Sequence, residues 1–113
     1  MIIKKIQREV FVNEAYREFL KTLTAFMEKE YPEEIFGKSK SEVEKRLWYC
    51  INKARRYGIS FERDITLFMV FCIVLGDDFD EQSDNQHLVA ILKDESLPMK
   101  QRLDDMGEII FSF

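Results

Sequence analysis

The densest group of ionisable side chains lies at residues 77–84, an acidic segment that contains five carboxylates and no base. Carboxylate or amide side chains stand at alternate positions, as in a calcium-binding loop: Asp78, Asp80, Gln82 and Asp84. The match then fails, because Ser83 stands where such a loop requires glycine and Val89 stands where it requires a bidentate glutamate. We therefore expect no metal ion and no cofactor. A helix-capping acidic loop is the favoured interpretation, and a patch facing a basic partner is the second.

A contact with a protein partner would use the charged residues of the acidic segment and its aromatic residue. These residues are Asp77, Asp78, Phe79, Asp80, Glu81 and Asp84. Phe79 is either tucked inward as a plug, which is favoured, or displayed as an anchor of the kind that carries much of the energy at interfaces. Trp48 and Phe113 are the other candidate anchors.

Catalytic chemistry finds little support in the sequence. His87 is the only histidine, and no serine or cysteine stands near it at a recognisable motif spacing. Glu62 and Asp64 are two residues apart on a predicted helix, so their carboxylates point to different faces. A small carboxylate-based hydrolase would need these groups and Asp80 to converge, and it is the least favoured function. We expect a protein that is not an enzyme.

The two cysteines, Cys50 and Cys72, lie in apolar helical contexts. This placement predicts reduced thiols in the core, not a disulfide. The sequence has neither a Cys-x-x-Cys motif nor a cluster of cysteine and histidine, so it does not predict a zinc site.

The net charge of −4 is unevenly distributed, because residues 1–76 carry +3 and residues 77–113 carry −7. An acidic chain disfavours binding to nucleic acid without sequence preference. The longest apolar run, residues 65–75, is about half of the ~20 residues that cross a bilayer. Residues 1–11 lack the apolar centre of a secretory signal. We expect a cytoplasmic protein that binds neither nucleic acid nor a membrane.

Hydrophobic periodicity predicts an all-α protein, a compact bundle of about five helices around a buried central helix at about residues 60–75. The length predicts a single helical domain over residues 1–113. The helices are expected at 2–30 with a candidate break at Val12–Asn13, from Ser41 to Gly58, at 60–75, at about 84–94, and from Leu97-Pro98 onward. Residues 32–40 are expected to form a loop that Ile35 and Phe36 pin to the core.

The predicted helix ends rest on capping residues. Ser41 with Glu44, and Ser83 with Gln86, have the spacing of capping boxes. Ser60 is expected to cap the central helix. Two glycines are expected to stop helices: Gly58 and Gly76.

The central helix and the helix before it differ in pattern. Thr66 is the only polar residue between Ile65 and Leu75, so we expect protein to surround the central helix on all sides. The preceding helix has one apolar stripe: Val43, Leu47, Cys50, Ile51 and Ala54. Its remaining surface is expected to be basic, and either solvated or matched to the acidic carboxyl-terminal half, through Lys45, Arg46, Lys53, Arg55 and Arg56.

Short stretches over most of the chain carry a family resemblance. They are ARRYGI at 54–59, ERD at 62–64, LGDDFD at 75–80, ILKD at 91–94 with Leu97, and Arg102-Leu103, after an opening Ile6-Gln7 and Phe11. This order resembles a group of small, uncharacterised, all-helical bacterial proteins encoded in type VI secretion effector and spike gene clusters. The chain differs from that group at 85–88, where an aromatic residue, often Trp, is common.

The resemblance implies a cytoplasmic accessory protein whose partner is a secreted effector or toxin encoded nearby. An immunity protein would bind and neutralise that toxin, whereas a chaperone or adaptor would hold the effector for loading. The residues also leave open a self-associating structural module, a homodimer formed through the apolar tail at 109–113 and other unpacked Phe residues.

Overall fold

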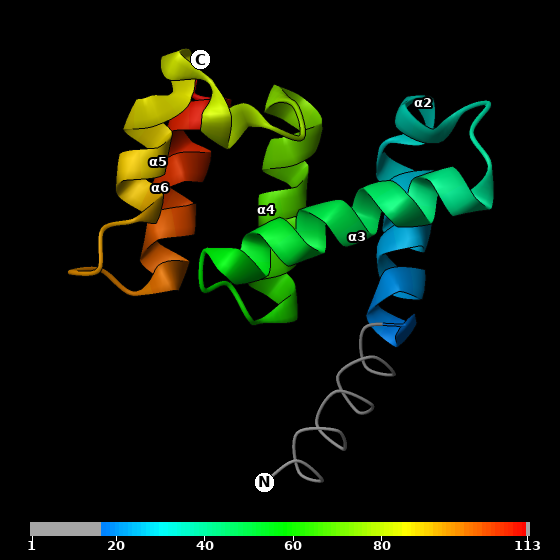
Figure 1. Ribbon diagram of the computed structural model, residues 1–113, viewed down its shortest axis with the longest axis horizontal. Helices are drawn as coiled ribbons and strands as arrows, with labels where there is room; N and C mark the ends of the chain where they lie inside the picture. Colours follow the sequence, from blue (N-terminus) through cyan, green and yellow to red (C-terminus); the bar gives the residue numbers. More distant parts are fainter. Residues whose placement is uncertain (1–16, 113) are drawn as a thin grey trace, which may run out of the picture. The chain divides into compact units, whose positions relative to one another are not determined.

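The computed structural model describes residues 17–112 (Figure 1). Over these residues every regular element is helical and none is a strand, which confirms the all-α prediction. A helix covers residues 17–30, and the later elements are α2 (Pro32–Ile35), α3 (Lys40–Arg56), α4 (Glu62–Leu75), the 3₁₀ turns η1 (Phe79–Glu81) and η2 (Ser83–Asn85), α5 (Gln86–Leu92) and α6 (Met99–Phe111). None of the helices described is long and apolar enough to cross a membrane.

The described residues group into two compact units that divide within α3, one ending at Trp48 and the other beginning at Tyr49. The prediction of a single helical domain stays a prediction. The expected break at Val12–Asn13 and the start of the predicted first helix lie outside the described residues.

In the first unit, the helix at 17–30 ends before Tyr31, because a residue that precedes proline is biased away from helical geometry. The prediction of a loop over all of 32–40 is wrong, since α2 forms one helical turn there. Pro32 suits the first helical position, and acidic Glu33 and Glu34 favour a helix amino terminus. Ile35 is half-buried, but Phe36 is 88% exposed and does not pin this segment to the core.

The start of α3 shows which of two overlapping caps the chain uses. The Ser39 hydroxyl accepts a hydrogen bond from the Glu42 backbone N–H at 3.1 Å, so the predicted cap at Ser41 is wrong. Ser39 and Ser41 are each followed by Glu three residues later, and the earlier pair lies at the helix start. The predicted apolar stripe is fully buried. Gly58, with φ of +87°, ends the helix as predicted.

In the second unit, α6 packs against both α4 and α5 (Figure 1). Gly107 of α6 faces α4, and a Cβ atom there would lie 3.8 Å from the Phe71 ring, at an ordinary van der Waals distance. Gly76, with φ of +109°, ends α4 as predicted. The predicted cap at Ser60 is wrong, because Phe61 holds the N-cap position and no side chain caps this end. The box of Ser83 and Gln86 is not formed either, because α5 begins at Gln86.

The burial of α4 is one-sided. Its core-facing side is buried through Asp64, Ile65, Phe68, Met69, Phe71 and Cys72. Three residues between them and the following Ile73 are only half-buried, and Val74 is 47% exposed, so the expectation that protein surrounds this helix on all sides is wrong. Cys50 and Cys72 are buried free thiols, as predicted, and a hydrogen bond between them is the main cause that raises the pKa of Cys72, with burial second.

Candidate functional site

The acidic segment folds into the two 3₁₀ turns η1 and η2 immediately after α4. Phe79 is 0% exposed, and its ring packs against Phe68 with centroids 5.7 Å apart. The interpretation of Phe79 as an inward plug is confirmed, and the displayed anchor is wrong. A buried aromatic residue therefore fixes the start of this segment to the core.

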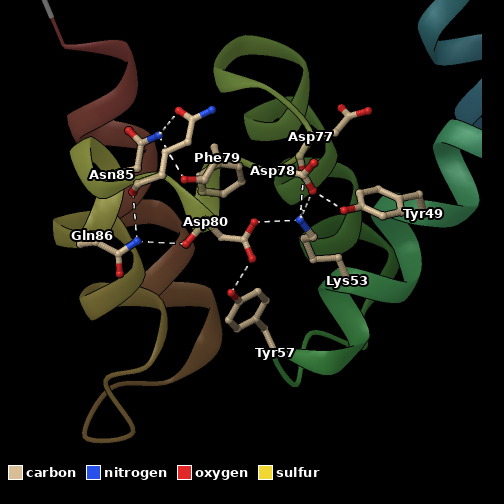
Figure 2. Close-up of polar contacts among 10 residues, drawn as sticks. Tyr49, Lys53, Tyr57, Asp77, Asp78, Phe79, Asp80, Asn85 and Gln86 are labelled. Atoms are coloured by element: carbon tan, nitrogen blue, oxygen red, sulfur yellow. Dashed lines mark hydrogen bonds and ion pairs between the residues drawn. The ribbon is translucent and has the colours of Figure 1, made fainter.

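Lys53 of α3 is the basic partner of the acidic segment. Its side chain is only 3% exposed, so Lys53 does not belong to a solvated basic surface. The alternative prediction, that this helix is matched to the acidic carboxyl-terminal half, is confirmed for Lys53. Its Nζ atom donates to the Asp77 carbonyl at 2.9 Å and to one carboxylate oxygen each of Asp78 and Asp80 at 2.8 Å (Figure 2). An ammonium group has three donors, and all three have acceptors here, which makes its burial tolerable.

Two tyrosines complete this site, which we call the lysine cluster: Tyr49, Lys53, Tyr57, Asp78 and Asp80. The Tyr49 hydroxyl donates to Asp78, and the Tyr57 hydroxyl donates to the second carboxylate oxygen of Asp80 at 2.6 Å (Figure 2). Nζ of Lys53 also lies 4.9 Å from the centre of the Tyr49 ring, within the range of a cation–π contact. Each carboxylate of the cluster is thus held by one ammonium and one hydroxyl.

The cluster stabilises the charged forms of its ions. Burial alone would lower the pKa of Lys53, but the hydrogen bonds that it donates to Asp78 and Asp80 outweigh this effect and raise that pKa. Burial acts to raise the pKa of Asp80, yet the bonds from Lys53 and Tyr57 lower it. The bond from Lys53, with that from Tyr49, lowers the pKa of Asp78. Since a nucleophilic or basic lysine must lose its proton, this geometry disfavours such a role for Lys53.

The tyrosine hydroxyls stay protonated. Burial, followed by the hydrogen bond to Asp80, raises the pKa of Tyr57 to about 12. The hydrogen bond to Asp78 is the main cause that raises the pKa of Tyr49. Both hydroxyls therefore serve as donors at neutral pH, and the cluster is suited to holding the acidic segment in one conformation.

Amide side chains fix the acidic segment from its other end. Asn85 donates to the Phe79 carbonyl at 3.1 Å, and Gln86 donates to the carbonyls of Asp80 and Gln82 at 3.1 and 3.0 Å (Figure 2). This use of the Gln86 side chain explains why it does not form the predicted capping box. The segment is held from both sides by side chains that bond to its backbone.

The predicted contact residues thus have different environments. Asp78 and Asp80 converge on Lys53, Asp77 supplies its carbonyl, and Phe79 is buried. Glu81 and Asp84 are exposed.

The residues of the alternative hydrolase site have separate partners. Asp64 pairs with Arg63 at 3.2 Å, Asp80 pairs with Lys53, and both Glu62 and His87 are exposed. Within residues 17–112, no group of three histidine, cysteine or acidic residues is placed to hold a metal ion.

The two tyrosines of the cluster and the burial of Lys53 were missed in the sequence. Tyr49, Lys53 and Tyr57 recur at steps of four, which places them on one side of a helix. Lys53 also stands between Cys50 and Ala54 of the apolar stripe. A lysine at the edge of a buried stripe, flanked by tyrosines and followed by a base-free acidic segment, is the signal that predicts this pairing.

The first unit contains a groove of about 1220 Å³ between residues of the helix at 17–30 and the start of α3. Trp48 lines it and is half-buried. Both signs of charge surround its apolar floor, including Arg17, Lys38 and Lys40 on one hand and Glu28 and Glu44 on the other. This mixed lining does not select one class of ligand.

Comparisons with known proteins identify no family for this chain. A scan against protein-family models, a search of curated proteins and a search of solved structures each found no match to this chain.

Proposed function

We propose that the protein is a non-enzymatic protein-binding module, an immunity protein that binds and neutralises a type VI secretion effector toxin in the cytoplasm. The observation that carries this proposal is the acidic segment held rigid by the lysine cluster. Lys53 makes three hydrogen bonds to it, while Glu81 and Asp84 remain exposed. A fixed acidic surface suits recognition of a basic protein, because little conformational entropy is lost on binding.

The residues behind the family resemblance support the same site. The stretch at 54–59 supplies Tyr57, and the stretch at 75–80 supplies Asp78 and Asp80. These two stretches meet at the lysine cluster through the hydrogen bond from Tyr57 to Asp80. The resemblance thus includes residues that shape the acidic surface, which links the proposed partner to this part of the molecule.

Co-expression of the full chain with the product of each neighbouring gene tests the proposal. We expect one of them, a toxin with a basic surface, to co-purify with the chain, and expression of the chain to rescue cells from that toxin. A double variant, Glu81→Gln with Asp84→Asn, should weaken the complex and its dependence on salt, because charges at an interface rim mainly steer association.

The matched control is Glu95→Gln, which removes an exposed carboxylate of the same unit outside the acidic segment. This variant should bind the toxin as the unmodified chain does. Absence of any co-purifying neighbour, together with unchanged self-killing and secretion after deletion of the gene, would contradict the proposal.

The alternative is an effector chaperone or adaptor, which could use the same acidic surface. Deletion of the gene separates the two roles: loss of an immunity protein exposes the producer to its own toxin, whereas loss of an adaptor stops delivery of the effector. A self-associating structural module is the remaining alternative, for which exposed Val74 and Phe111 are the relevant observation. Light scattering on the purified chain measures that directly.

A further inference from the structure

One side of α4 is apolar and only partly covered. Along this side lie Thr66, Leu67, Val70, Ile73 and Val74, which are half-buried except for the exposed Val74. An uncovered helix face in a globular protein normally carries polar residues. Thr66 is the only polar residue among these, and its hydroxyl donates to the Glu62 carbonyl of its own helix at 2.8 Å. We call Leu67, Val70, Ile73 and Val74 the open face of α4.

The open face has the spacing of a helix-docking surface. Leu67, Val70 and Val74 stand at i, i+3 and i+7, so they form one row along the helix. Phe111 of α6 extends this row sideways, since its ring packs against Phe71, three residues before Val74, with centroids 6.3 Å apart. Gly107 adds no side chain to the seam between the two helices. The result is a shallow apolar strip along α4 and the end of α6.

The charges around this strip are predominantly negative. Asp104 and Glu108 precede Phe111 on the same side of α6, at steps of four and three residues. Arg63, the base at the amino-terminal end of α4, is already paired with Asp64 at 3.2 Å and with Asp104 at 3.3 Å. The last turns of α4 and α6 contain no base, and each helix carries partial negative charge at that end. The apolar strip therefore has an acidic border.

We propose that the open face of α4, together with Phe111, docks an amphipathic helix of the partner protein whose apolar stripe is flanked by Lys or Arg. This inference rests on the proposed protein-binding function and supplies the apolar anchor that buried Phe79 cannot. A second copy of the chain fits less well, because a symmetric contact would bring the acidic borders of two copies together. The acidic segment directly follows α4 in the chain, and both surfaces suit a basic partner.

Three labelled helical peptides of about 18 residues, or five turns, test the chemistry of the strip. The first has a leucine stripe flanked by Lys and Arg, the second has the same stripe flanked by Glu, and the third has an alanine stripe flanked by Lys and Arg. Fluorescence anisotropy with the full chain should show binding of the first peptide alone. Its affinity should fall as salt rises, because the flanking charges contribute.

Two substitutions test the location, and one serves as a matched control. Val74→Ser and Phe111→Ser should each weaken binding of the first peptide by about tenfold. Ile109→Ser should leave it unchanged. Ile109 is 45% exposed, close to the 47% of Val74, and lies two residues from Phe111, on the other side of α6. Thermal unfolding of all three variants confirms that each is folded.

Failure of the first peptide to bind, equal binding of the alanine peptide, or equal weakening by Ile109→Ser would overturn the inference. So would a dimer in light scattering that Val74→Ser abolishes, because this result assigns the face to a second copy. Co-purification with neighbouring gene products separates the two proposals. A toxin complex unaffected by Val74→Ser leaves the proposed function standing and removes the docking face. Peptide binding that Val74→Ser weakens, without any co-purifying neighbour, leaves the docking face standing and removes the proposed function.

Discussion

The second unit contains two regions that depart from the usual burial of apolar groups and exposure of charges. At the lysine cluster a charged side chain is buried, and along the open face of α4 aliphatic side chains reach the surface. The first departure is compensated inside the unit, because every donor of Lys53 has an acceptor. The second has no such compensation among the described contacts. The comparison teaches that the cluster shapes the molecule, whereas the open face is the surface left for the proposed partner.

Lys53→Met should give the largest loss of unfolding free energy among the variants. A small loss would contradict the view that the lysine cluster shapes the molecule. The variant leaves the Asp77 carbonyl and the carboxylates of Asp78 and Asp80 without their shared donor. Removal of one partner from a buried ion pair costs about 3 kcal/mol of unfolding free energy. Urea unfolding measures this loss, with the exposed Lys45→Met on the same helix as the control, which should change stability by less than about 0.5 kcal/mol.

Asp80→Asn should cost less, about 2 kcal/mol, because it removes a charge-assisted hydrogen bond but keeps a polar side chain. The effect should depend on pH. The folded-state pKa of Asp80 lies below its ordinary value of 3.8, so its charged form stabilises the fold above that pH, and the contribution is lost as pH falls through the folded pKa. The difference in stability between the unmodified chain and the variant should therefore close in acid, and a constant difference would contradict this assignment.

Tyr57→Phe should cost about 1 kcal/mol at neutral pH, the usual contribution of one hydrogen bond. The pKa of Tyr57 is raised from 10.0 to about 12, so its contribution is fully present below the first value and is lost as pH rises through the second. The free energies of unfolding of the unmodified chain and the variant, measured at increasing alkaline pH, should converge across this window. Curves that stay parallel would show that the hydroxyl does not bond to Asp80.

Val74→Ser should have the smallest effect on folding, a change within about 0.5 kcal/mol, because the side chain is half exposed already. This outcome sharpens the comparison, since the same substitution is expected to weaken helix binding. Thermal unfolding measures it beside Ile109→Ser. A large loss of stability would mean that Val74 belongs to the core, and the open face would then be a part of the fold.

The features that the sequence predicts well are those that depend on periodicity or on backbone geometry. The stripe from Val43 to Ala54 is buried, and the left-handed glycines Gly58 and Gly76 end helices. Caps are less predictable, since Ser39 and Ser41 have equal local patterns and the choice depends on where α3 begins.

The candidate site could be predicted only in part. The acidic segment and the inward position of Phe79 follow from local sequence, but the burial of Lys53 depends on partners 24 to 27 residues away. The open face of α4 could not be predicted from its pattern, because a helix without a polar face is expected to be covered everywhere. That expectation assumes that the cover belongs to the same chain, whereas a partner protein can supply it.

The separation between Lys53 and its acceptors also sets an order of events during synthesis. The acceptors lie 24, 25 and 27 residues later in the chain, so the carboxyl-terminal half of α3 leaves the ribosome before its lysine has any of them. Contacts across such a distance form only after the cost of closing the intervening loop is met. The end of α3 should therefore be completed only once residue 80 has left the ribosome, which ties its folding to the emergence of η1.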